Sequence, residues 1–167
     1  HYDFLPTLLD FLDLPIPEPE SLPGHSFAPL LRGAGLPGHQ NVVVFDEYGP
    51  VRMIRDRRWK YVHRYPYGPH ELYDLEEDPG EEHNLVGETG AAQAIAPLKA
   101  ELDRFFVRYA DPARDGTREA VYGVGQIGLA GPAGKGSPAF HQEVCHVDEN
   151  GRPRGAGYWP LGPIDPR

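Results

Sequence analysis

The sequence is poor in cysteine, in cationic side chains and in long apolar runs. Its one cysteine, Cys145, excludes an internal disulfide. The 16 Lys and Arg residues stand against 25 Asp and Glu, a formal net charge of -9, whereas nucleic acids and anionic membranes are bound by clustered cations. No apolar run approaches the roughly 20 residues that span a bilayer. We therefore expect a soluble chain that binds neither nucleic acid nor membrane, in a compartment that the sequence leaves open.

The length and the hydrophobic content of the chain are sufficient for a folded domain. The chain has 167 residues, of which 40% are hydrophobic and 11% aromatic. This composition is not that of a disordered polypeptide, and the length is enough for one domain with a core. The sequence starts at His1 and enters an apolar segment at once, which suggests a piece of a longer protein.

Two helical segments are predicted near the start. In residues 3–14, Asp3 suits an N-cap position and leucines recur at helical spacing (Leu5, Leu8, Leu9 and Leu12). The proline-rich stretch "PIPEPESLPG" then stops the helix. A short helical turn is expected in "SFAPLLRG", between Ser26 and Gly33.

The middle of the chain predicts a small sheet. Four β-rich segments, separated by turn residues, cover residues 42–48, 51–56, 58–64 and 70–75. Because their links are short, antiparallel pairing is favoured over crossover connections. One face of this sheet needs a cover to keep its apolar side chains from water.

Residues 91–109 provide that cover. Their apolar residues repeat at helical spacing, as the stripe Ile95, Leu98, Leu102, Phe105 and Tyr109. Pro97 conflicts with a helix unless it sits near the helix start. We therefore predict an α+β domain over residues 1–110, with a four-stranded antiparallel sheet and a C-terminal helix packed on one face.

Composition changes after residue 110. The last 57 residues hold 11 of the 20 glycines and 7 of the 19 prolines, a content typical of segments that do not hold structure alone. Four aromatic residues are spread through this stretch, namely Tyr122, Phe140, Tyr158 and Trp159. The sequence predicts an extended Gly/Pro-rich arm over residues 111–167 that lies on another surface, and thus a possible homo-oligomer through the arm.

The stretch "HELYDLEEDPGEEHNL" is rich in acids but indicates a turn. Asp78-Pro79-Gly80 is a turn signature, in which Asp can cap and Pro presets its own dihedral. His70 and His83 stand thirteen positions apart and lack the spacing that places two metal ligands on one helix face. We interpret the stretch as the end of a strand followed by a turn.

Other motifs fail on their context. "GVGQIG" at 123–128 matches the dinucleotide fingerprint, but the glycine-rich residues after it cannot form the required helix. His141, Cys145 and His146 are three potential zinc ligands without an obvious fourth. The sequence thus predicts no cofactor, no catalytic residue and no metal ligand in this chain.

Charged residues around the first two strands allow two interpretations. Asp46, Glu47, Arg52 and Arg55 could form cross-strand salt bridges, which contribute little at a surface. Alternatively, strand-end groups orient an anionic or hydroxyl-rich substrate, with Arg paired bidentately to a sulfate or carboxylate. Because loops carry sites more often than sheet interiors do, the candidate substrate-binding residues are Glu47, Tyr48 and Arg52.

The order of four motifs resembles the C-terminal part of the sulfatases, a family within the alkaline phosphatase superfamily. The motifs are "DFLPTLLDFLDLPIPE", "GHSFAPLLRG", "RMIRDRRWKYVHR" and "ELYDLEEDPGEEHNL". Type I sulfatases carry D-x-x-P-T-L-L-D, G-x-S-x-x-P-L-L-x-G, R-x-x-K-Y and L-Y-D-L-x-x-D-P-x-E-x-x-N-L in the same order. The resemblance covers residue 3 to about residue 108.

The resemblance implies a hydrolase of sulfate esters whose formylglycine and calcium or magnesium ion lie in an N-terminal catalytic domain. Cys145 precedes His146 and Val147, not the x-Pro-x-Arg of a formylglycine motif. The chain alone is therefore expected to be inactive and to act with its own N-terminal domain. Alternatives are a subdomain of a phosphonate or phosphodiester hydrolase, or a non-catalytic carbohydrate-binding or assembly module.

Overall fold

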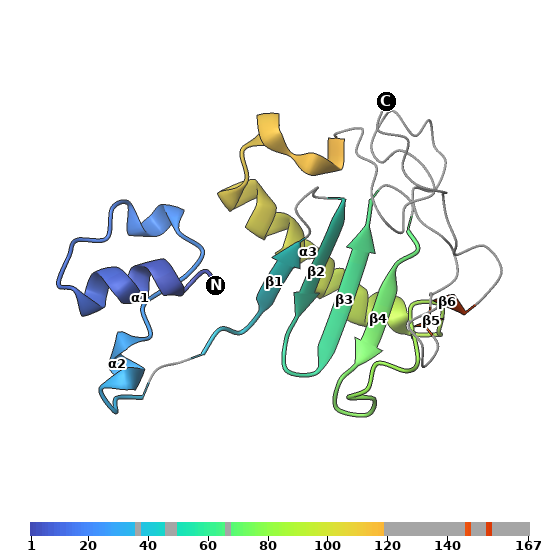
Figure 1. The fold of residues 1–167 in the computed structure, drawn as a ribbon. Helices are drawn as coiled ribbons and strands as arrows, with labels where there is room; N and C mark the ends of the chain where they lie inside the picture. Colours follow the sequence, from blue (N-terminus) through green and yellow to red (C-terminus); the bar gives the residue numbers. More distant parts are fainter. Residues whose placement is uncertain (36–37, 46–49, 66–67, 119–145, 148–152, 155–167) are drawn as a thin grey trace.

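The computed structural model describes residues 1–35, 38–45, 50–65, 68–118, 146–147 and 153–154. Its centre is one antiparallel sheet in the order β1-β2-β3-β4 (Figure 1). The strands are β1 (Val42–Phe45), β2 (Val51–Arg55), β3 (Trp59–Arg64) and β4 (Glu71–Asp74). Each strand lies within a segment predicted to be β, so the antiparallel meander is confirmed.

Helix α3 (Ala91–Tyr109) covers one face of the sheet (Figure 1). Alternate strand residues point toward it, because side chains along a strand alternate between the two faces. Ile54 pairs with Tyr61, which pairs with Leu72, so that these three side chains share the covered face. Leu98 and Leu102 of α3 close the same buried cluster. The predicted α+β architecture is confirmed.

Pro97 lies inside α3 rather than near its start. A proline there removes the hydrogen bond that the carbonyl of Gln93 would accept. Both Pro97 and Gln93 are exposed, so water can satisfy that carbonyl and the helix continues.

The N-terminal elements stand beside the β1 edge of the sheet (Figure 1). They are α1 (Phe4–Phe11), η1 (Pro19–Ser21) and α2 (Ala28–Leu31). Helix α1 ends earlier than the predicted 3–14, because Asp13 adopts a left-handed φ of 56°. Gly33 follows α2 with a φ of 82°, as expected for a glycine that ends a helix.

Short polar contacts tie α1 to α2. The Thr7 hydroxyl donates to the Asp3 carbonyl at 2.6 Å and accepts from the Phe27 amide at 3.0 Å. The Ser26 hydroxyl donates to Asp10 Oδ2 at 2.5 Å. This helical pair connects to the sheet through the Tyr2 hydroxyl, which donates to the Val43 carbonyl at 3.1 Å.

The acidic stretch after β4 is the turn that the sequence predicts. The Asp78 carboxylate accepts from the amides of Glu82 and His83, at 3.1 and 2.8 Å. These hydrogen bonds lower the pKa of Asp78. His70 lies elsewhere, stacked on His63 with ring centroids 4.2 Å apart.

Little of the predicted arm falls within the described residues. They include η2 (Pro112–Arg114), η3 (Gly116–Arg118), β5 (His146–Val147) and β6 (Pro153–Arg154). The "GVGQIG" motif, Cys145 and the four aromatic residues of the arm lie outside them. In the described part of the chain, no helix combines the length and the apolarity that a membrane span requires.

Candidate binding pocket beside Arg52

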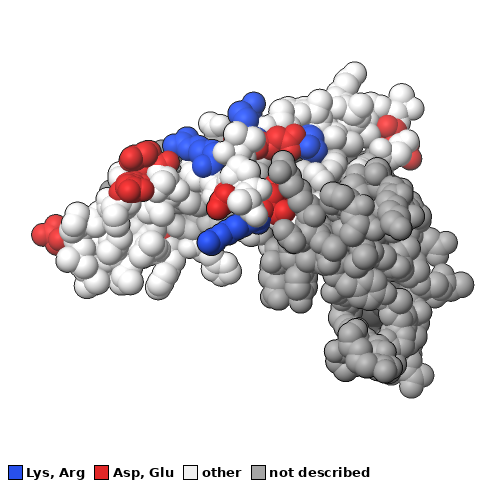
Figure 2. Space-filling view, turned by 90° about the horizontal axis from the view of Figure 1, so that it is seen from above, with Lys and Arg blue, Asp and Glu red and all other residues white. Residues whose placement is uncertain are grey.

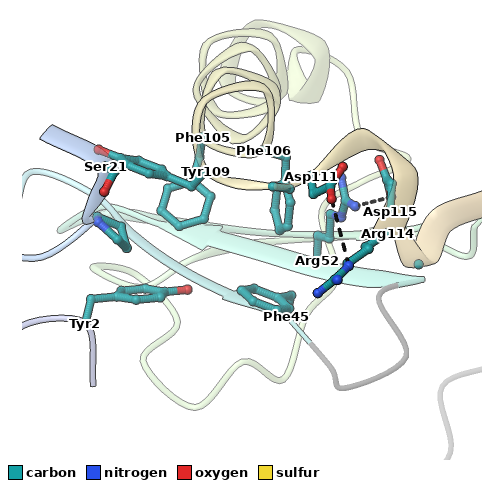
Figure 3. A pocket seen from close by; sticks show the side chains of 13 residues that line it. Tyr2, Ser21, Phe45, Arg52, Phe105, Phe106, Tyr109, Asp111, Arg114 and Asp115 are labelled. Carbon is teal, nitrogen blue, oxygen red and sulfur yellow. Dashed lines mark hydrogen bonds and ion pairs between the residues drawn. The ribbon is translucent and has the colours of Figure 1, made fainter. Parts of the chain in front are cut away.

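A cavity of about 340 Å³ opens where α3, the strands β1 and β2 and the N-terminal segment meet (Figure 3). Five aromatic side chains line it, and its charged side chains gather at one end (Figure 3). The lining side chains include Tyr2, Phe45, Arg52, Phe106, Asp111 and Asp115. Aromatic walls with a few convergent polar groups are typical of small-molecule sites.

The aromatic wall comes mainly from the last turns of α3. Phe105 and Phe106 stand edge-on to one another, and Phe105 lies 5.0 Å from Tyr109 between ring centroids. Tyr2 approaches Phe105 at 5.6 Å, and Phe45 at the end of β1 meets Phe106 at 5.3 Å. These tilted and edge-on contacts are the favourable geometries for aromatic pairs.

Arg52 forms the charged end of the pocket. Its side chain is buried, and the guanidinium lies 3.5 Å above the Phe106 ring. Arg52 Nη2 donates to Asp115 Oδ1 at 2.5 Å, whereas the buried Nε has no hydrogen-bond partner among the residues that the structure describes. A buried donor without an acceptor is unfavourable in free energy. A ligand acceptor that reached Nε would therefore form a hydrogen bond with a donor that is already in position.

Asp115 is the counterion of Arg52. Partial burial alone would raise the pKa of Asp115, but hydrogen bonds from the Thr117 hydroxyl and amide, together with Arg52, lower it. The carboxylate therefore stays ionised at neutral pH. An anionic ligand at this end would compete with Asp115 for the guanidinium.

The structure places one of the three predicted binding residues at the pocket. Arg52 lines it, while Glu47 and Tyr48 lie outside the described residues, as does Asp46. Among the described residues, the ion-pair partner of Arg52 is Asp115, which follows α3, and not a residue of a neighbouring strand. A separation of 63 residues carries no local sequence signal for this pair.

Two histidines, His63 and His70, form a partly buried group on the sheet face that carries Arg52. His63 stacks on His70, and its Nδ1 lies 2.7 Å from the Tyr61 hydroxyl. Burial lowers the pKa of His63 to about 3, and the nearby charges of His70, Lys99 and Arg52 add to this, while Asp103 opposes it. Burial also lowers the pKa of His70, with Arg64 and Lys99 contributing.

We expect this pair to make the domain acid-sensitive. The folded pKa of His63 lies below its unfolded value, so its stabilising effect is complete above about pH 6.5 and is lost as the pH falls toward about 3. The unfolding free energy of both proteins should decrease as the pH falls from about 7 to about 5. The decrease should be smaller for His63→Gln than for the wild type, by about 1 kcal/mol after allowance for partial exposure. Urea unfolding followed by tryptophan fluorescence measures this.

The matched control is His83→Gln, because the His83 side chain is 78% exposed. This variant should follow the wild-type pH profile. Equal acid sensitivity of all three proteins would show that His63 does not carry the effect.

Three side chains that the sequence did not connect lie close together near α1. They are Asp3, His25 and His39, whose potential ligand atoms all fall within 4.8 Å of one another. Within the described residues this is the group of His, Cys, Asp and Glu side chains able to hold a metal ion. The ligands are 22 and 14 positions apart, so no spacing rule could have found them.

Comparison with known proteins defines the class to which this fold belongs. Residues 1–108 match the family described as N-sulphoglucosamine sulphohydrolase, C-terminal. The chain belongs to this family, and it is a C-terminal sulfatase domain. The resemblance noted from the four sequence motifs is confirmed.

The relatives are sulfatases of bacteria and animals. The chain is 36% identical to the delta 4,5-hexuronate-2-O-sulfatase of Bacteroides thetaiotaomicron, over 67% of this chain and 24% of that protein. It is 31% identical to human arylsulfatase A, over 60% of this chain and 26% of that protein. A solved 2-O GAG sulfatase matches with a TM-score of 0.55 and 37% identity, over 67% of this chain and 25% of that one. The chain thus spans about a quarter of the length of these relatives.

Proposed function

We propose that this chain completes a sulfatase that removes sulfate esters from a carbohydrate, and that it supports a catalytic domain lying N-terminal to it. The relatives support the carbohydrate, since one is a hexuronate-2-O-sulfatase and another an ulvan-active sulfatase. A phosphonate monoester hydrolase shares the fold at 20% identity, which keeps that reaction as the second candidate.

One observation carries the proposal, an apolar surface that this chain leaves open. The helices α1 and α2 and the residues just after α1 expose large hydrophobic side chains on a domain otherwise rich in charge, namely Phe4, Leu5, Leu8, Phe11, Leu12, Leu14, Leu30 and Leu31. We call these eight side chains the α1–α2 face. Seen from above, the N-terminal part of the molecule around α1 is largely uncharged, with acidic side chains at its edge (Figure 2).

An apolar surface of this kind marks an interaction site in a water-exposed protein. Burying each Leu or Phe contributes about 1.5–3 kcal/mol. The neighbouring edge strand β1 also exposes Val42 and Val44. The α1–α2 face and this edge are the surfaces that we assign to the contact with the catalytic domain.

The residues of this chain do not fit the sulfatase cofactors. A formylglycine position is missing, because Cys145 is followed by His146 and Val147 rather than by the x-Pro-x-Arg motif. We propose that formylglycine and a calcium or magnesium ion belong to the N-terminal domain. No step of the hydrolysis is assigned to residues of this chain.

At the substrate cleft, we propose that Glu47, Tyr48 and Arg52 form part of the rim. The pocket beside Arg52 supports this role, since aromatic rings can stack on a sugar and the free Nε of Arg52 can donate to an anionic group. The 46–49 link connects Phe45, which lines the pocket, to Pro50.

The coding sequence directly upstream tests the proposal. We expect it to encode a Cys-x-Pro-x-Arg or Ser-x-Pro-x-Arg motif followed by the aspartates that bind the metal ion. If both are absent, this chain is a carbohydrate-binding or assembly module instead. Presence of the motif with activity on phosphonate esters alone would favour the second candidate.

We also propose the division into a domain at 1–110 and an arm at 111–167, with the arm docked on the catalytic domain or on a second copy of the chain. Ordering the arm costs about 1–2 kcal/mol per residue, so it requires a surface to lie on. Light scattering should show more than one copy per particle for the whole chain and a single copy for a chain ending at Arg118, which retains Asp115 for Arg52. A single copy per particle at both lengths would assign the arm to the catalytic domain.

A further inference from the structure

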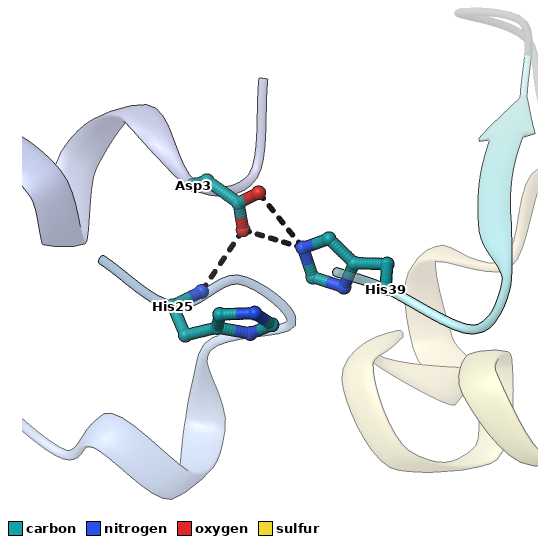
Figure 4. A group of neighbouring side chains, drawn as sticks. All are labelled: Asp3, His25 and His39. Atoms are coloured by element: carbon teal, nitrogen blue, oxygen red, sulfur yellow. Dashed lines mark hydrogen bonds and ion pairs between the residues drawn. The ribbon is translucent and has the colours of Figure 1, made fainter. Parts of the chain in front are cut away.

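Asp3, His25 and His39 come from three segments that meet at the joint between the helices and the sheet (Figure 4). Asp3 precedes α1, His25 precedes α2, and His39 lies on the connection into β1. His39 Nε2 lies 2.8 Å from Asp3 Oδ1 and 2.7 Å from Asp3 Oδ2. The ring of His25 lies beside that of His39, with centroids 4.2 Å apart.

This donor set has the chemistry of a zinc site. Two imidazoles and one carboxylate are the protein ligands of several three-ligand zinc sites, where water takes the fourth position. A tetrahedral ion bound at about 2.0–2.1 Å holds its ligand atoms about 3.3 Å apart. His39 and Asp3 are closer than this and His25 falls within 4.8 Å, so the side chains must rotate to admit the ion.

We propose that Asp3, His25 and His39 bind a divalent zinc-type ion that fastens α1 and the segment before α2 to the connection leading into the sheet. All three side chains belong to this domain. It would act as a structural clamp on the α1–α2 face.

Further contacts fit a metal ligand at Asp3. The backbone amide of His25 donates to Asp3 Oδ1 at 2.9 Å, which fixes the orientation of the carboxylate. Hydrogen bonds to metal-binding carboxylates commonly hold them in place.

The simpler alternative is an ion pair between His39 and Asp3 without a metal. The chain contains a control for it, since His83 Nδ1 lies 3.7 Å from Asp78 Oδ2, and His83 is 78% exposed in its side chain. That pair has one imidazole and one carboxylate, and no second histidine belongs to it in the described residues. A pair of this kind should bind zinc far more weakly than the three-ligand group.

The test is titration of the whole chain with Zn²⁺ by isothermal calorimetry, after treatment with a chelator. All proteins carry Cys145→Ser, so that a thiolate in the arm does not contribute. We expect one ion per chain, with affinity reduced at least about tenfold by His39→Ala or His25→Ala, since even loss of an outer-shell partner costs that much. His83→Ala should bind as the parent does.

His25 and His39 are exposed, so their loss should leave the fold intact, which circular dichroism verifies. Co²⁺ gives a second readout, as a visible absorption of a nitrogen and oxygen site that His39→Ala abolishes. The proposal is overturned if the parent binds Zn²⁺ no better than the double variant of His25 and His39. It is also overturned if binding follows His141→Ala and His146→Ala instead. Neither outcome depends on sulfatase activity, so failure of the clamp and failure of the proposed function are separable.

Discussion

Replacing Arg52 with alanine should destabilise the domain by about 2–4 kcal/mol, less than for a fully buried pair because Asp115 remains partly exposed. The change leaves the Asp115 carboxylate without its counterion and removes the guanidinium from the face of Phe106. Arg52→Lys should recover part of the loss, because lysine restores the charge but not the planar stack. Urea unfolding measures both.

Arg55→Ala is the matched control, since Arg55 lies on the same strand but is exposed. Its effect should stay within about 0.5 kcal/mol, as for most surface substitutions. Equal effects of the two alanine variants would show that the Arg52–Asp115 link is not a stabilising contact.

In the protein that carries the catalytic domain, Phe11→Asp should abolish most of the activity. Phe11 is 66% exposed in this chain, so in the isolated chain the substitution should change the unfolding free energy by less than about 1 kcal/mol. Against a packed partner surface, the same aspartate would be a buried unpaired charge, which is strongly unfavourable. The contrast between the two proteins identifies the α1–α2 face as the domain contact.

Val107→Asp controls for the introduction of a charge. Val107 is a hydrophobic residue of α3 that is 85% exposed and does not belong to the α1–α2 face. Its replacement should leave activity unchanged. Loss of activity with Val107→Asp but not with Phe11→Asp would place the contact on α3 instead.

The sequence predicted the elements whose signal is local. Alternation and turn residues located all four strands, and the apolar stripe from Ile95 to Tyr109 located α3 with its bounds. The sequence predicted where α1 begins but not where it ends, because no glycine or asparagine marks the left-handed turn at Asp13. Pro97 was an apparent conflict that exposure to water removes.

The site features that escaped prediction depend on contacts between distant segments. Arg52 meets Asp115 only because the segment after α3 folds back over the end of β2. Asp3, His25 and His39 meet only because α1, α2 and the connection to β1 converge. The Asp3 side chain also forms hydrogen bonds with His25 and His39, and it does not cap the amides of helix α1 as the sequence suggested. Local periodicity contains no information about such convergence.

The most direct test of this account is sulfate release from a 2-O-sulfated uronate disaccharide, measured for this chain alone and for the protein that also contains the upstream domain. We predict release by the longer protein, loss of that release with Phe11→Asp, and none from the chain alone. Metal-dependent turnover by the chain alone, or a longer protein that cleaves phosphonate monoesters and no sulfate ester, would contradict the assignment.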